Sequence, residues 1–354
     1  MREGDKAGFL ATVDPQASAP FKAAQARLFD GLRSLPLADY RLEARTQDSG
    51  DLAGGRPHTY LPETRQRMRL KGYDAVDAVD SLWLTFVERD GRWLIHNDDD
   101  LSVLGLDTAR GLWDFGPVAA QPTPHFLMLS HPAEAGRAQA LGAIAEEAVA
   151  LLNSRWTQPW PGRIPVVLPS DNAELAAIIQ STLDLDKFVA FVGYGAVRDS
   201  GYEPTAPRVY IQDKNLGRYS RSFQVETLTH ELHHAAVAPI SGPLIPAWVH
   251  EGVADWVALG RRTNERRPSG GGPHLPRDYE FVTGDQAGIT RSYRGSRAAM
   301  STLARAKGLD GPGAFLKTLG AVRLAPGSVD YQADQALRAA SGLSIADLEA
   351  RWAR

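Results

Sequence analysis

The chain has 354 residues, of which 43% are hydrophobic and 23% charged, and its formal net charge is −3 at pH 7. This balance is typical of a soluble globular protein and gives no basic surface for nucleic acid, so we expect no nucleic-acid partner. Because the chain contains no cysteine, disulfides, thiolate metal sites and a cysteine nucleophile are excluded. Any bound metal must be held by histidine and carboxylate side chains, which favours a catalytic over a structural site.

The length predicts two domains, and residues 1–120 form the first as an α+β unit. Apolar spacing predicts two helices, over 5–13 and 20–35. Four strands are predicted to follow, over 40–45, 64–73, 80–89 and 92–97. The last two flank Asp90-Gly91, a strong signal for a hairpin turn. We expect two helices followed by a curved antiparallel sheet.

Residues 121–160 are predicted to connect the two domains. The stretch 117–132 mixes prolines with the short apolar run 126–129, which indicates a linker or a crossing strand. The alanine-rich stretch 133–156 has apolar residues at helical spacing and predicts a helix that packs between the domains.

The second predicted domain covers residues 161–354. Its expected elements begin with a small sheet and a helix, with strands over 164–168, 188–192 and 208–212 and a helix over 171–179. A helix is predicted over 222–238, and another carries the tryptophan-rich segment 246–256. The Gly- and Pro-rich stretch 261–278 predicts a mobile loop, which either covers a cleft or only connects its neighbours. Several helices are expected over 290–354.

The sequence His230-Glu231-Leu232-His233-His234 lies inside the helix predicted over 222–238. Residues four apart on a helix share a face, so His230 and His234 can direct two imidazoles at one ion. Glu231 lies about a quarter turn away, where its carboxylate can act on a water as a general base. Two histidines in a buried helix are also compatible with ordinary core packing. The motif indicates zinc-assisted hydrolysis.

Two carboxylates in the segment 246–256 strengthen that interpretation. A catalytic zinc site has three protein ligands and one open position, and Glu251 can supply the third ligand. Asp255 follows one helical turn later, placed to accept the free ring N–H of a ligating histidine. A solvated helix face is the simpler alternative, but the neighbouring tryptophans and valines predict a largely buried helix.

The motifs HELHH and P-x-W-x-x-E-G-x-A-x-W together resemble the gluzincin clan, the thermolysin-like zinc metallopeptidases of peptidase-MA type, over about residues 164–354. The resemblance implies a zincin domain with a small sheet, an HExxH helix, a Glu-ligand helix and a helical C-terminal part. It implies that Zn²⁺ is held by His230, His234 and Glu251. Glu231 matches the general base, and Asp255 matches the carboxylate that orients a ligand.

The same resemblance leads to further expectations about the catalytic residues. Gluzincins use a Tyr or His to stabilise the oxyanion, and Tyr293 is the candidate here because it opens the helix after the loop. A packing role for this tyrosine is the alternative. His233 points away from the ligand face and is expected to pack or lie at the surface. His250 is assigned no role.

The resemblance also bears on the substrate, which is expected to be a peptide or protein. In the clan an edge strand beside the cleft pairs with substrate backbone, and here the strand 208–212 would do so. An ordinary edge strand is the equal alternative. The chain lacks the Gly-x-Met-Glu-Asn-like segment of the clan's aminopeptidases, which favours an endopeptidase or a selective processing protease.

The order of elements in residues 1–120 weakly resembles an NTF2-like domain. Such folds form ligand pockets or docking surfaces, so an alternative function is a non-catalytic binding or scaffold protein in which this domain binds the ligand or partner. A third possibility keeps the zinc and hydrolyses a substrate other than protein.

The sequence contains no run of ~18 apolar residues, so we expect no membrane span. The first residues have no apolar signal region, and we expect that a targeting or anchoring segment has been removed. The excess of arginine over lysine and the abundant alanine are typical of a GC-rich bacterial genome. The expected location is extracellular or membrane-tethered on the outer face of a bacterial cell.

Overall fold

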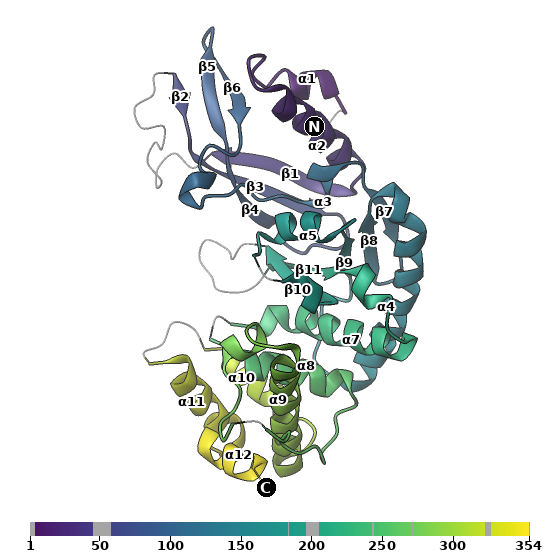
Figure 1. Ribbon diagram of the computed structural model, residues 1–354, viewed down its shortest axis with the longest axis vertical. Coiled ribbons are helices and arrows are strands. Elements are labelled where there is room, and N and C mark those ends of the chain that lie inside the picture. The colour runs from purple at the N-terminus through teal and green to yellow at the C-terminus, as the bar shows by residue number, and fades with distance from the viewer. Residues whose placement is uncertain are drawn as a thin grey trace.

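A computed structural model describes residues 4–44, 58–182, 184–195, 205–242, 244–270, 272–322 and 327–353 of the chain. The fold is of the mixed α+β class, with small sheets and many helices. Two three-stranded sheets lie at one end, a five-stranded sheet lies in the middle, and the C-terminal helices form the other end (Figure 1).

The N-terminal strands form two sheets instead of the single curved sheet that was predicted. The first has the order β1-β3-β4 and the second the order β2-β5-β6. The predicted strand over 80–89 is divided at the buried Leu84, where the chain passes from one sheet to the other. Arg45, the last residue of the predicted strand 40–45, lies outside the described residues. The strands are β1 (Leu37–Ala44), β2 (Thr59–Tyr60), β3 (Glu63–Leu70), β4 (Ala78–Trp83), β5 (Thr85–Arg89) and β6 (Arg92–Asn97).

The predicted hairpin between β5 and β6 is confirmed. Arg89 pairs with Arg92, so the loop contains only Asp90 and Gly91. Both loop residues have positive φ, 50° and 74°, as a type I′ turn requires. This turn matches the twist of the flanking strands, which explains why the Asp-Gly pair determines the register here.

Three helices accompany these sheets, α1 (Lys6–Leu10), α2 (Ala19–Arg33) and α3 (Leu112–Phe115). The Ser18 side chain accepts a hydrogen bond from the Phe21 backbone N–H and caps α2, close to the predicted start. The helix predicted over 5–13 is shorter than expected. It ends at Leu10, and Val13 forms a β-bridge with Ile95.

The central sheet has five strands in the order β10-β11-β9-β8-β7. The stretch 117–132, predicted as a linker or crossing strand, supplies two of them as an antiparallel pair, and the helix after it crosses over to the parallel strand β9. The elements are β7 (Ala119–Pro122), β8 (Phe126–Ser130), α4 (Ala135–Arg155), β9 (Ile164–Leu168), β10 (Ala190–Gly195) and β11 (Thr205–Ile211).

The prediction that the strand 208–212 is an edge strand is wrong. β11 pairs with β10 on one side and with β9 on the other, so both of its hydrogen-bonding edges are used. Among the described strands, β10 is the edge strand on this side of the sheet. β11 lies inside the sheet because it pairs antiparallel with β10 and parallel with β9.

The central sheet is buried on both faces. Phe126 and Met128 of β8 belong to the large core formed with α4 and the C-terminal helices. Leu127 and Leu129, which alternate with them, pack against residues of α2, α3 and β3. The N-terminal sheet β1-β3-β4 therefore shares an apolar core with the central sheet, which accounts for the continuous burial of β8.

Most of the α-helices that follow β11 fill the C-terminal end, whereas α5 lies beside the central sheet (Figure 1). No helix in the described ranges combines the length and apolar character that a bilayer span requires. The α-helices are α5 (Asn172–Ile179), α6 (Asp213–Leu216), α7 (Arg221–Val237), α8 (Ala247–Ala258), α9 (Gln286–Lys307), α10 (Gly311–Gly320), α11 (Val329–Ser341) and α12 (Ile345–Trp352). The 3-10 helices are η1 (Ser102–Leu104), η2 (Pro132–Glu134), η3 (Leu185–Lys187), η4 (Ala238–Ile240) and η5 (Asp278–Phe281).

Candidate metal centre

Helix α7 carries the two histidines that the motif singles out. The Ser220 side chain caps its start by accepting a hydrogen bond from the Phe223 backbone N–H, and every residue from Leu228 to Val237 is buried. His230 and His234 lie one turn apart, so their rings project from the same face of the helix. Their Nε2 atoms are 2.9 Å apart.

Helix α8 brings Glu251 to the same point. Its Oε2 atom lies 3.0 Å from Nε2 of His230 and 3.4 Å from Nε2 of His234. Ligand atoms of the three residues all lie within 4.8 Å of one another, so the group could hold a metal ion. Zinc binds nitrogen and oxygen ligands at about 2.0–2.2 Å, and one ion between three atoms at these separations meets that requirement. The three predicted ligands are therefore brought together.

The charges in this group suit metal binding. Burial by itself would raise the pKa of Glu251, but the His234 and His230 rings hold it well below its usual range. Burial by itself would lower the pKa of His230, but Asp255 and Glu251 raise it well above its usual range. Glu251 is thus held as a carboxylate, the form in which glutamate binds a metal. A metal ion can take the place of the positive charge that the His230 ring carries beside it.

Asp255 lies one turn after Glu251 on α8, as predicted. Its Oδ1 atom is 2.9 Å from Nδ1 of His230, on the side of the ring opposite the group of ligand atoms. Its Oδ2 atom accepts a hydrogen bond of 3.3 Å from Arg297 of α9, whose Nε donates to Glu265 at 2.6 Å. The His230 ring is held by a chain of charged groups, and such contacts fix the direction of a metal ligand.

Arg297 and Glu265 were not predicted as site residues. The only local signal for Arg297 is its position one helical turn after Tyr293, on the face of α9 that the tyrosine shares. Glu265 lies in the Gly- and Pro-rich stretch, where no periodic pattern distinguishes it. Both roles depend on the packing of α9 against α8.

His234 is held differently from His230. Its Nδ1 atom is buried and has no hydrogen-bond partner in the described part of the chain. The His250 ring stacks on it, with centroids 4.3 Å apart and planes 21° apart. Burial and the His234 ring lower the pKa of His250 to about 3, so His250 packs against His234 as a neutral ring. The sequence assigned His250 no role, and Tyr194, which donates to the His234 carbonyl at 3.3 Å, was missed.

His233 packs away from the ligand atoms. Its ring is fully buried and meets Trp156 edge-on, with centroids 4.6 Å apart. It is not part of the group that could hold a metal. Of the two places expected for it, the structure selects core packing over the surface.

Glu231 faces a cavity of about 340 Å³ beside the ligand group, and His230, Asp255 and Tyr293 also line it. Within the described ranges the Glu231 side chain makes no hydrogen bond or ion pair. Burial raises its pKa, and the neighbouring imidazoles act in the opposite direction. A carboxyl group with a raised pKa and free oxygens, next to three possible ligands, is equipped to exchange protons with a molecule in the cavity.

Tyr293 is brought to the same site by the close packing of α9 on α8. A Cβ atom on Gly252 would lie only 2.9 Å from the Ser296 carbonyl oxygen, so glycine at this position permits the approach. The Tyr293 ring centroid is 6.1 Å from that of His230. Burial raises the pKa of Tyr293 well above its usual range, and the Glu251 and Glu231 carboxylates raise it further. The hydroxyl therefore stays protonated and able to donate.

The mouth of this cavity has apolar and charged walls that the sequence did not suggest. Tyr219 and Phe223 are 49% and 39% exposed, and their ring centroids lie 4.3 Å apart with the planes tilted by 31°. Glu226 and Arg294 also line the cavity, and neither makes a hydrogen bond or ion pair in the part of the chain that the structure describes. The site thus offers a large aromatic surface with both signs of charge nearby.

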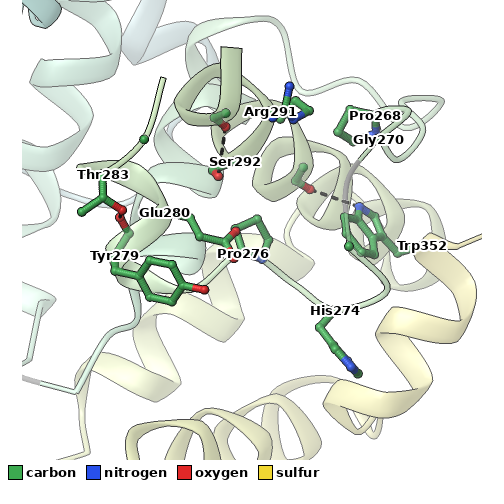
Figure 2. Close-up of a pocket in the computed structure, with 14 residues that line it drawn as sticks. Pro268, Gly270, His274, Pro276, Tyr279, Glu280, Thr283, Arg291, Ser292 and Trp352 are labelled. Carbon is green, nitrogen blue, oxygen red and sulfur yellow. Dashed lines mark hydrogen bonds between the residues drawn. The ribbon is translucent and has the colours of Figure 1, made fainter. Parts of the chain in front are cut away.

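A second cavity, of about 360 Å³, lies on another face of α9 (Figure 2). Arg291 and Ser292 line it, as do Pro268, Gly270 and His274 of the Gly- and Pro-rich stretch. The described part of this stretch lines the second cavity and contributes no residue to the wall of the first. Two roles were expected for this stretch, covering the cleft or only connecting its neighbours. Its described residues do not cover the cavity at the metal ligands.

Comparisons with protein-family models, with curated proteins and with solved structures found no match.

Proposed function

We propose that the chain is a zinc-dependent peptidase of the gluzincin type, with His230, His234 and Glu251 as metal ligands. The observation that carries the proposal is the unbonded Glu231 carboxyl, which faces a cavity of about 340 Å³ beside the converging ligand atoms. A site built only to hold a structural ion would be closed by a fourth protein ligand and would need no such carboxyl.

Bound zinc would act as a Lewis acid and lower the pKa of a coordinated water. Glu231 accepts the proton of the attacking water and later delivers it to the leaving amine. Tyr293 donates its hydroxyl hydrogen to the oxyanion, for which its high pKa suits it. Asp255 keeps the His230 ring in position. Glu231 and Tyr293 line the same cavity, and Asp255 lines it too, which supports these three roles.

A peptide substrate is supported by the position of β10. Among the described strands it is the sheet edge, and its first residue Ala190 and the preceding Val189 line the cavity that Glu231 faces. An unpaired strand edge binds extended peptide backbone whatever its side chains. The role expected for the strand 208–212 is thus better filled by β10. With no segment recognised for a substrate amine, we favour an endopeptidase or a selective processing protease.

The proposal is tested by digesting a peptide library with zinc-loaded wild type and Glu231→Gln, with cleavage followed by mass spectrometry. We expect the wild type to cleave and Glu231→Gln to keep its zinc and lose about 10²–10⁴-fold in rate. The control is His274→Ala, because the His274 side chain is 70% exposed and lies in the second cavity. Equal cleavage by wild type and Glu231→Gln would overturn the mechanism. Zinc binding without any cleavage would favour a binding protein or a hydrolase of another substrate.

A further inference from the structure

A third cavity, of about 330 Å³, lies between the sheet β1-β3-β4 and the central sheet, and shares no lining residue with the cavity at the metal ligands. Met68 and Ala78 form its wall on the N-terminal side. Phe191 and Tyr210 form its wall on the central sheet. In Figure 1 the strands β10 and β11 lie between the N-terminal sheet and α7, so this cavity and the metal group are on opposite sides of the central sheet.

Asp80 is a carboxylate on the wall of this cavity to which no described residue donates a hydrogen bond. Of the other charged residues on the wall, Arg208 makes a two-pronged ion pair with Asp74, at 2.6 and 2.7 Å. Arg110 donates to Asp98 at 2.6 Å. Asp80 makes no hydrogen bond or ion pair anywhere in the described residues. Arg208 attracts the Asp80 carboxylate, but its guanidinium hydrogen-bonds Asp74, so the oxygens of Asp80 stay open to a ligand.

The position of Asp80 in its strand makes this carboxylate unusual. Asp80 pairs with Gln66 and Ala78 with Met68, so all four side chains share the face of the sheet that turns toward the apolar core. Aspartate is disfavoured in strands, and the half-buried Asp80 carboxylate has no hydrogen bond in the described residues to offset the cost of its burial. Burial raises the pKa of Asp80, as expected for such a place. A carboxylate with no hydrogen bond in the described residues, placed among apolar and aromatic side chains, points to a role in binding.

The rest of the wall is aromatic. Phe191 and Tyr210 stack across the β10–β11 pair, with centroids 5.3 Å apart and planes 17° apart. Trp113 also lines the cavity, and its Nε1 is buried without an acceptor in the described part of the chain. Aromatic faces attract cations as well as apolar groups, so they suit the same class of ligand as the carboxylate does.

We propose that this cavity binds a small organic cation, whose ammonium or guanidinium group pairs with Asp80 and whose apolar body lies against Trp113, Phe191 and Tyr210. The site is independent of the metal centre and of the function proposed for it. A neutral aromatic molecule would fill the same space without meeting Asp80, and an anion would be repelled by it. The charge of the ligand is therefore the property to test.

The experiment titrates the full-length protein with benzylammonium, benzyl alcohol and benzoate by calorimetry, up to about 10 mM, which detects millimolar affinities. We expect one benzylammonium per chain and at least about tenfold weaker binding of the other two, because a buried charged contact is lost. Asp80→Asn keeps the shape of the side chain and should weaken the binding of benzylammonium by about tenfold. Ala109→Leu narrows the cavity while Asp80 itself is unchanged, and it should weaken the binding of all three probes.

The matched control is His230→Ala, which alters the metal centre alone and should bind benzylammonium as the wild type does. Thermal melting of each variant checks that it is folded. Absence of benzylammonium binding by the wild type would overturn the proposal, as would equal affinity for the three probes or an unchanged affinity in Asp80→Asn. Loss of binding in His230→Ala would assign the probe to the metal cavity and overturn it too. None of these results depends on peptidase activity, so the two proposals can fail separately.

Discussion

The Nδ1 atom of His230 lies 2.9 Å from the Oδ1 atom of Asp255, and this contact directs the other ring nitrogen toward Glu251. Replacing Asp255 by asparagine keeps the size of the side chain but removes its charge. We expect zinc affinity about 10–100-fold weaker, since contacts that orient a metal ligand carry this weight. Competition with a chromogenic chelator measures it. Asp310→Asn, at a side chain that is 92% exposed, should leave the affinity unchanged. Equal affinities in the two variants would contradict the orienting role.

Tyr293→Phe separates catalysis from metal binding. The ring and its packing remain, and only the hydroxyl that faces Glu251 and Glu231 is removed. We expect normal zinc content and a fall of about 10²–10³-fold in kcat, because a donor to the oxyanion acts in the transition state. Steady-state kinetics on a cleaved peptide measure it, with Tyr279→Phe as the control at an exposed tyrosine. An unchanged kcat would assign Tyr293 to packing alone.

Gly252→Ala tests the close approach of α8 and α9. The added Cβ would lie 2.9 Å from the Ser296 carbonyl oxygen, so the helices must separate. We expect a loss of about 1–3 kcal/mol in the free energy of unfolding, measured with urea, together with weaker zinc binding. In Gly136→Ala the new methyl group meets nothing within 4 Å on α4, and helix propensity predicts a small gain. A loss of equal size in both variants would argue against a specific helix contact.

We expect the protonation of His131 to make part of the free energy of unfolding depend on pH. Its Nε2 lies 2.7 Å from Glu174 of α5 and its Nδ1 lies 2.8 Å from the Pro117 carbonyl oxygen. The Glu174 hydrogen bond raises the pKa of His131 against the effect of burial, so the folded state favours the charged ring. This contribution is complete below the unfolded pKa of about 6.5 and is lost as the pH rises through the higher folded value.

Urea unfolding across this pH interval checks the expectation for His131. The wild type should lose stability as the pH rises, and His131→Asn should lack that part of the slope. His274→Asn, at an exposed histidine, is the control. A variant with the same pH slope as the wild type would show that the stability does not depend on this ring.

The sequence by itself determined the local parts of the candidate site. The spacing of His230 and His234 places both rings on one helix face, and the four-residue step from Glu251 to Asp255 does the same on α8. The Asp90-Gly91 turn was equally predictable, because a two-residue hairpin imposes its own backbone conformation. In each case the interaction is between residues a few positions apart.

The tertiary structure alone decided which distant segments meet. It placed β10 at the sheet edge and β11 inside it, because strand order follows from long-range pairing and not from the pattern within a strand. It set Arg297 against Asp255 across the contact of α9 with α8. It also turned Asp80 toward the aromatic wall of the central sheet. These relationships join residues from about 40 to more than 100 positions apart, and no periodicity of the chain records them.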